Sequence, residues 1–173
     1  MNLPPQFKPI TTFIFDVDGV LTDGTVLVLE NGLQARSMSI KDGFALQLAV
    51  KCGYHVVIVS GSTPSPVVDR LNKLGITAIH MSVLDKQSFI AGYMEKNSLE
   101  KEQVLYMGDD LPDLPAMSIV GLSACPADAV EEIRDAVKYI SPSKGGHGCV
   151  RDVIEKVLKL NDHWKYHPEV ASN

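Results

Sequence analysis

The sequence predicts an α/β fold built on a mainly parallel sheet, because short apolar runs alternate with longer segments of helical pattern. The runs are rich in β-branched residues and apolar nearly throughout, which is typical of strands buried on both faces. They occupy residues 11–17, 54–60, 78–81, 103–107 and 120–124. Since parallel neighbours must be joined by crossovers that lie on the sheet faces, we predict a Rossmann-like three-layer sandwich.

Helical segments with recognisable ends separate these runs. The first, 41–52, stops at Gly53, and the next, 64–74, begins with Pro64 and has Gly75 just beyond its end, as helices favour. Further helices are predicted at 86–96, 128–136 and 150–160.

One segment breaks the alternation. Residues 25–40 contain two extended runs around Asn31-Gly32, a strong signal for a tight turn between antiparallel strands. We therefore expect a small β-hairpin insertion after the first strand, at about 24–40.

Length and composition indicate one domain. The 173 residues, 45% of them hydrophobic, can bury a single core, which we place at 1–160. A polar tail at 161–173 follows and is expected to be loose unless a partner holds it.

Charge and hydropathy indicate which partners to exclude. The chain has 16 basic and 21 acidic residues and no block of like charge, which indicates no nucleic-acid partner. No apolar stretch approaches the ~20 residues that span a bilayer, the first ten residues do not resemble a signal peptide, and the three cysteines are widely spaced. These features predict a cytoplasmic protein with no membrane contact.

Polar residues follow four of the predicted strands, at the edge where parallel sheets bind ligands. They are Asp16, Asp18 and Asp23; Ser60, Gly61 and Ser62; Asp85 and Lys86; and Asp109, Asp110 and Asp113. Each alone is more simply a cap or turn residue. Taken together, the carboxylates would repel one another if they converged without a cation between them. A site with only oxygen ligands favours Mg²⁺. A phosphate beside them would need the positive charge of Lys86, the Ser60 hydroxyl and backbone amides. The set therefore predicts phosphoryl transfer.

This pattern resembles the haloacid dehalogenase superfamily, whose phosphatases carry the motif DxDGxxTD, matched here by residues 16–23. The resemblance implies that Asp16 is the nucleophile and that Asp18 acts first as general acid and then as general base. Ser60 and Lys86 match the second and third motifs of the superfamily. Mg²⁺ would be held by Asp16, by the backbone carbonyl of Asp18 and by Asp109, and Asp113 would orient the loop or bind the metal through water.

The spacing between the motifs leaves no room for the large cap domain that most relatives carry. The chain resembles the capless subgroup typified by 3-deoxy-D-manno-octulosonate 8-phosphate phosphatases, through KDG at 41–43, GDDLPD at 108–113 and GGHGCVRD at 145–152. That resemblance implies a phosphorylated sugar acid as substrate, a role in lipopolysaccharide biosynthesis, and a homotetramer whose hairpins form a central barrel while a neighbour completes each site. It also implies that Gly61, Lys41 and Arg151 bind substrate.

Two departures leave the substrate open. Octulosonate phosphatases usually have arginine where this chain has Ser62, and the nonulosonate phosphatases of the subgroup tend to have glutamate there. Lys41 stands where arginine is common, and lysine cannot reproduce a bidentate grip on a carboxylate. The alternatives are a nonulosonate 9-phosphate or another small phosphomonoester as substrate, or a non-catalytic oligomerisation module, which the intact aspartates and Lys86 disfavour. His147 either reaches the substrate or has no role.

Overall fold

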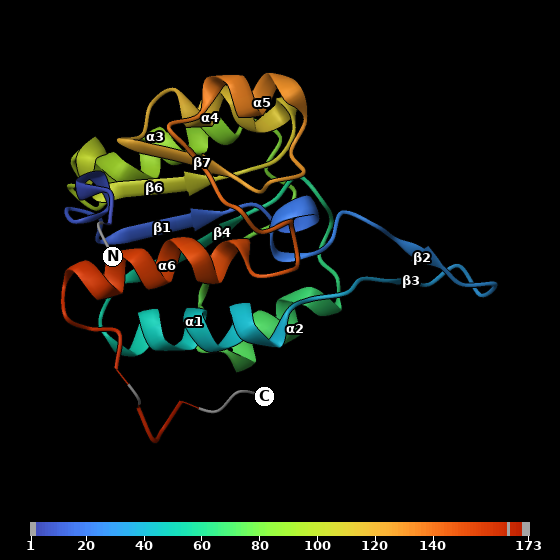
Figure 1. Ribbon diagram of the computed structural model, residues 1–173. Helices are drawn as coiled ribbons and strands as arrows, with labels where there is room; N and C mark the ends of the chain where they lie inside the picture. The colour runs from blue at the N-terminus through green and yellow to red at the C-terminus, as the bar shows by residue number, and fades with distance from the viewer. Residues whose placement is uncertain (1–2, 166, 171–173) are drawn as a thin grey trace.

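The computed structural model describes residues 3–165 and 167–170, and a six-stranded parallel sheet organises them (Figure 1). Along the sheet the order is β5-β4-β1-β6-β7-β8. The strands are β1 (Thr12–Phe15), β4 (His55–Val59), β5 (Ala78–His80), β6 (Val104–Met107), β7 (Leu122–Cys125) and β8 (Tyr139–Ile140). The chain passes to one side of β1 through β4 and β5, and to the other side through β6 to β8. The topological switch point, where such sheets bind ligands, therefore lies at the carboxyl end of β1.

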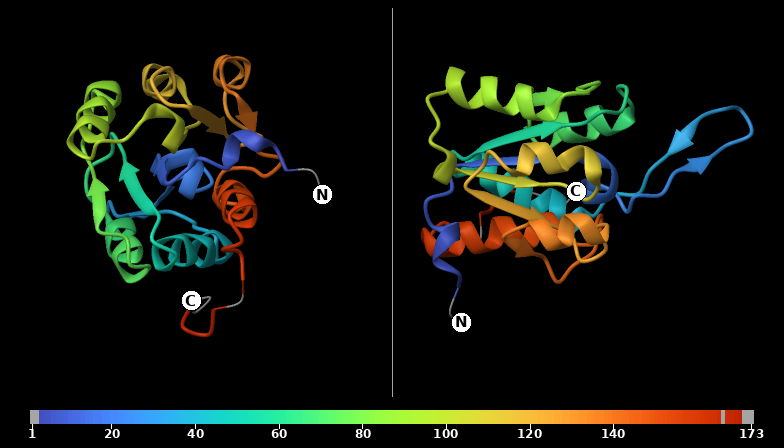
Figure 2. Two further views of the ribbon diagram at one scale, coloured as in Figure 1. Left: turned by 90° about the vertical axis from the view of Figure 1, so that its left-hand side faces the viewer. Right: turned by 90° about the horizontal axis from the view of Figure 1, so that it is seen from above.

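Helices cover both faces of the sheet (Figures 1 and 2). One layer contains α1 (Ile40–Lys51), α2 (Pro66–Lys73) and α6 (Cys149–Leu160), and the other contains α3 (Lys86–Lys96), α4 (Leu114–Met117) and α5 (Glu131–Ala136). Short helical turns complete the chain: η1 (Pro5–Phe7), η2 (Val17–Leu21), η3 (Lys101–Gln103) and η4 (Leu111–Asp113).

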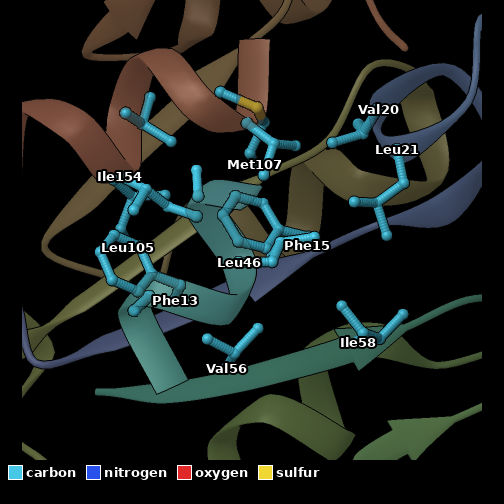
Figure 3. Close-up of a cluster of buried hydrophobic side chains, with 14 of the residues drawn as sticks. Phe13, Phe15, Val20, Leu21, Leu46, Val56, Ile58, Leu105, Met107 and Ile154 are labelled. Carbon is cyan, nitrogen blue, oxygen red and sulfur yellow. The ribbon is translucent and has the colours of Figure 1, made fainter. Parts of the chain in front are cut away.

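Alternate strand residues divide between the two layers, as the pleat of a strand requires. Phe13 and Phe15 of β1 face the layer of α1 and α6, where the close-up of the core shows them beside Leu46 (Figure 3). Ile14, between them, faces the opposite layer. All three are buried, the polar Thr12 stands only at the start of β1, and the first charged residue, Asp16, comes directly after the strand. The core thus fixes where the polar site begins.

The predicted α/β sandwich is confirmed. All five predicted strands and five predicted helices form, with ends that differ from the predicted ones by at most three residues. The structure adds the four-residue α4 and the two-residue edge strand β8, which are too short to leave a periodic pattern.

The predicted hairpin also forms. Its strands β2 (Leu27–Val28) and β3 (Gln34–Ala35) pair antiparallel, and the turn between them contains Gly32 with a φ of +81°. We call residues 25–37 the arm. The arm projects away from the body beyond the carboxyl ends of the strands (Figures 1 and 2). Its apolar side chains are exposed: Leu27 by 63%, Val28 by 67% and Leu33 by 62%.

The described part of the C-terminal tail, 161–165 and 167–170, differs from the expected loose segment. Trp164 packs edge-on against Phe44 of α1, and the Tyr54 hydroxyl lies 2.9 Å from Nδ1 of His163. Position 166 and residues 171–173 of the predicted tail lie outside the described residues. Among the residues that the structure describes, no helix has both the length and the apolar character needed to cross a membrane.

Candidate active site

A cavity of about 530 Å³ opens at the carboxyl end of the sheet, around the end of β1. Side chains that follow three strands, and one that opens α3, converge on it. Of the residues predicted to form the site, those that line the cavity are Asp16, Asp18, Ser60, Gly61, Ser62, Lys86, Asp109, Asp110 and Asp113. The structure thus brings together four motifs that are separated by up to almost a hundred residues of sequence.

Lys86 is the buried cation of the cavity. Its Nζ lies 3.0 Å from Oδ1 of Asp16 and 2.6 Å from Oδ1 of Asp113, and its side chain is only 5% exposed. Burial alone would lower the pKa of Lys86, but the charges of Asp16 and Asp113 raise it above its usual value. Lys86 therefore stays protonated, and it fixes the direction of the Asp16 carboxylate.

Asp113 accepts four hydrogen bonds and positions its neighbours. Its Oδ1 accepts from Lys86 Nζ and, at 2.5 Å, from the Tyr106 hydroxyl. Its Oδ2 accepts from the backbone N–H groups of Asp109 at 2.9 Å and Asp110 at 3.3 Å. Sequence reasoning missed Tyr106, because a tyrosine inside an apolar strand indicates only core packing.

The arrangement of carboxylates fits a divalent cation held between Asp16 and Asp109. Oxygens of Asp16, Asp109 and Asp113 lie within 4.8 Å of one another. Because a carboxylate offers about four lone-pair positions and Asp113 already accepts four hydrogen bonds, Asp113 has none left for a metal. Asp113 is thus a structural acceptor, whereas Asp16 and Asp109 supply the oxygen donors that hard cations prefer.

Electrostatics also favour a cation here. Burial and the charge of Asp113 raise the pKa of Asp16 to about 6, although Lys86 opposes the shift. Burial and the charges of Asp16, Asp113 and Asp110 raise the pKa of Asp109 to about 7. Burial and mutual repulsion together disfavour the charged carboxylates more than Lys86 can compensate, and a bound cation would stabilise them.

Glycines let the loops approach closely. Gly19 adopts a φ of +81°, and a Cβ at this position would overlap the carboxylate of Asp109. Gly145 and Gly146 lie directly against the turn formed by 17–23, and the Gly146 N–H donates to the Val20 carbonyl at 2.9 Å. The glycine-rich segment predicted near the site therefore supports the turn that carries Asp18. Nδ1 of His147, in the same segment, lies 2.7 Å from the carbonyl oxygen of Gly145.

Asp18 has two partners that the sequence did not indicate. Arg36 Nε donates to its Oδ1 at 2.7 Å, and the Ser62 hydroxyl donates to its Oδ2 at 2.6 Å. Arg36 comes from the arm and Ser62 from the loop after β4, so both reach Asp18 from other parts of the chain. Ser60 lies beside them and accepts from the Ser62 N–H at 3.1 Å.

Two predicted substrate-binding residues do not line this cavity within the single chain. Lys41 is exposed on the first turn of α1. Arg151, on α6, pairs through Nε with Glu155 at 3.2 Å and stacks over Phe44 and Trp164. Beside Lys41, the buried Asp42 accepts from the N–H groups of Gly148 and Arg151 and so caps the start of α6.

Comparisons with known proteins agree with this geometry. A protein-family model described as haloacid dehalogenase-like hydrolase matches residues 79–154. The fold and the carboxylate cluster are those of a hydrolase of this class, and the candidate active site lies at the end of β1.

Comparison with individual proteins identifies a family within this class of hydrolases. The 3-deoxy-D-manno-octulosonate 8-phosphate phosphatase of Escherichia coli (strain K12) is 36% identical over 86% of this chain and 79% of its own length. The solved structure of the Yersinia pestis phosphatase of the same name has a TM-score of 0.88, with 33% identity, and covers 91% of this chain and 85% of that one. The Moraxella catarrhalis structure, in complex with a magnesium ion, a phosphate ion and a KDO molecule, has a TM-score of 0.87, 33% identity and 91% coverage of both chains. The chain belongs to the 3-deoxy-D-manno-octulosonate 8-phosphate phosphatase family, a family of phosphoric monoester hydrolases.

The raised pKa values predict how stability depends on pH in the absence of divalent cations. An acid whose pKa is raised by folding holds its proton more tightly in the folded chain, so its stabilising contribution is present at low pH and is lost as pH rises. The contribution of Asp16 is lost as the pH rises from near 4 to about 6, and that of Asp109 as the pH rises from near 4 to about 7. We therefore expect the melting temperature to fall between about pH 4 and about pH 7, and added Mg²⁺ to raise it more at the upper end of this range and above.

Asp109→Asn tests this assignment, and Asp69→Asn, at an exposed aspartate of α2, is the matched control. Without metal at about pH 8, Asp109→Asn should melt at a higher temperature than the wild type, because one of the repelling charges is gone. It should also lose most of the Mg²⁺-induced increase. An undiminished Mg²⁺ response in Asp109→Asn, measured by differential scanning fluorimetry, would contradict the metal site.

Proposed function

We propose that this protein is a Mg²⁺-dependent phosphatase that hydrolyses the phosphomonoester of a sugar acid, with 3-deoxy-D-manno-octulosonate 8-phosphate as the preferred substrate. The observation that carries the proposal is the buried Lys86, which orients Asp16 beside Asp109 at the switch point of the sheet. Relatives about one-third identical over most of the chain bear that activity in their names, and the Moraxella relative binds Mg²⁺, phosphate and KDO.

In the first step, an oxygen of Asp16 attacks the phosphorus while the bond from phosphorus to the sugar oxygen breaks. Asp18 donates its proton to the departing oxygen, so the sugar acid leaves as a neutral alcohol and Asp16 carries the phosphoryl group. In the second step, Asp18 takes a proton from a water whose oxygen attacks the phosphorus, the bond from phosphorus to the Asp16 oxygen breaks, and inorganic phosphate is released. Both Asp16 and Asp18 then return to their starting forms.

The remaining residues of the cavity bind and orient the phosphate. The ammonium of Lys86, the Ser60 hydroxyl and the backbone of Gly61 supply the positive charge and donors that a phosphate beside carboxylates needs. Asp16, the backbone carbonyl of Asp18 and Asp109 would hold the cation. When bound, Mg²⁺ neutralises these carboxylates and stabilises the charge on the transferring phosphoryl group.

We assign Lys41 and Arg151 to substrate binding on the family resemblance, and since neither lines the cavity of its own chain, they would act across a subunit boundary. A cytoplasmic location belongs to the same proposal, supported by three free cysteines, of which Cys125 and Cys149 are buried. The alternative substrates are a nonulosonate 9-phosphate or another small phosphomonoester, because the serine at position 62 matches neither the arginine usual in octulosonate phosphatases nor the glutamate of nonulosonate phosphatases.

A homotetramer would explain the arm. A two-stranded hairpin alone is at best marginally stable in water, and this one leaves Leu27, Val28 and Leu33 more than half exposed. Packing arms against one another would bury these side chains. It would also bring neighbouring surfaces to the cavity, which has no cap domain of its own.

Asp16→Asn tests the nucleophile. Because the amide is a poor nucleophile of nearly the same shape, we expect magnesium-dependent phosphate release to fall by at least about 10³-fold while the circular dichroism spectrum is unchanged. Asp135→Asn, at an exposed aspartate of α5, should keep full activity. Substantial turnover by Asp16→Asn would disprove the assignment.

A substrate panel tests the specificity. Phosphate release with Mg²⁺ should give the highest kcat/KM for 3-deoxy-D-manno-octulosonate 8-phosphate, with lower values for a nonulosonate 9-phosphate and for glucose 6-phosphate. A higher value for the nonulosonate ester would mean that the serine at position 62 marks a changed specificity.

Light scattering tests the assembly. We expect a mass four times the 18.8 kDa of one chain. A double substitution in the arm, Leu27→Lys with Val28→Lys, should lower that mass, because charges would replace the apolar contact surface. A monomeric wild type with full activity would contradict the tetramer.

A further inference from the structure

The arm reverses the usual placement of side chains. Its leucines and valines face outward, whereas Arg36, the residue that follows β3 directly, is only 13% exposed at its side chain. An arginine is rarely buried unless it is paired, since removing its charge from water is costly. Arg36 turns back from the projecting arm toward the cavity, and the partner it meets there is Asp18.

The contacts on Asp18 are divided between its two oxygens. Arg36 Nε donates to Oδ1 at 2.7 Å, and the Ser62 hydroxyl donates to Oδ2 at 2.6 Å. Guanidinium nitrogens can only donate, whereas a hydroxyl can donate or accept. The contact with Arg36 therefore keeps Oδ1 as an acceptor, and Oδ2 is left as the oxygen that can carry a proton, with Ser62 able to bond it in either form.

We propose that Arg36 is a positioning residue for the general acid and base, holding the Asp18 carboxylate so that Oδ2 faces the leaving oxygen of the substrate. This inference rests on the role of Asp18 in the proposed function, and it does not depend on which sugar acid is the substrate. Because the arm carries Arg36, the arm and the proton-transfer step are linked through one side chain. Lys86 fixes the nucleophile from one side of the cavity, and Arg36 fixes the acid from another.

The test uses the leaving group. An alkyl phosphate needs a proton on its departing oxygen, whereas 4-nitrophenolate leaves readily as an anion, so only the first depends on a well-placed acid. The quantity to compare is kcat/KM, which reports the steps through release of the first product. With Mg²⁺ and the full-length protein, Arg36→Met should lower kcat/KM by about 10²-fold for the best alkyl substrate of the panel. For 4-nitrophenyl phosphate the decrease should be no more than a few-fold.

Two further variants connect the effect to Asp18. Asp18→Asn should show the same selective loss, and adding Arg36→Met to it should cause little further decrease for the alkyl substrate, because both changes disable one proton transfer. Arg36→Lys keeps the charge without the planar guanidinium, so its kcat/KM for the alkyl substrate should lie between the values of the wild type and Arg36→Met. Arg134→Met, at an exposed arginine of α5, is the matched control and should leave both substrates unaffected.

Equal losses on both substrates in Arg36→Met would overturn the inference, since a folding, assembly or general binding defect acts on both alike. Additive losses in the double variant would overturn it too. The selective pattern, obtained on any alkyl phosphate, would support the inference even if the panel places a different sugar acid first. Absence of magnesium-dependent turnover of every ester would instead overturn the proposed function and the inference together.

Discussion

The buried ammonium of Lys86 is the interaction on which the site depends. It joins the end of β1, through Asp16, to the loop after β6, through Asp113, and it comes from the first residue of α3. The ion pairs of this one ammonium group thus connect three separate elements of the fold. Without it, Asp16 and Asp113 would face each other unpaired at low exposure, at a cost that protein folding rarely tolerates. With it, Asp113 can in turn hold the backbone of Asp109 in place.

The parts of this arrangement that the sequence predicted are those that follow directly from strand ends. Asp16 directly follows β1 and Asp109 lies two residues after β6, both mainly apolar strands, and Lys86 opens a helix with a clear start. In a parallel sheet such positions converge whatever the details of packing, so local pattern alone brings them together. The hairpin was equally predictable, since Asn31-Gly32 supplies the turn chemistry that a tight connection requires.

The sequence could not predict side-chain contacts that form only when distant parts of the chain come together. Tyr106 is indistinguishable from a core residue until its hydroxyl is found on Asp113. Arg36, in a hairpin with exposed neighbours, has the pattern of a solvated surface residue, and only the backward turn of its side chain reveals its partner. Lys41 and Arg151 were assigned to substrate binding by resemblance alone, and the single chain places both away from the cavity.

The arm explains how an enzyme without a cap domain can organise its cavity. A cap excludes water and adds substrate contacts from above the sheet, and here nothing in the described chain covers the carboxyl ends of the strands in that way. The arm leaves the body at that same edge, with exposed apolar side chains along its strands and, at its base, the largely buried Arg36 paired with Asp18. An insertion of this size cannot enclose a substrate, but packing against other chains would make it rigid. A rigid arm would keep Arg36, and through it the Asp18 carboxylate, at a fixed position relative to Asp16. Assembly would then contribute precision to proton transfer, through the contact between Arg36 and Asp18.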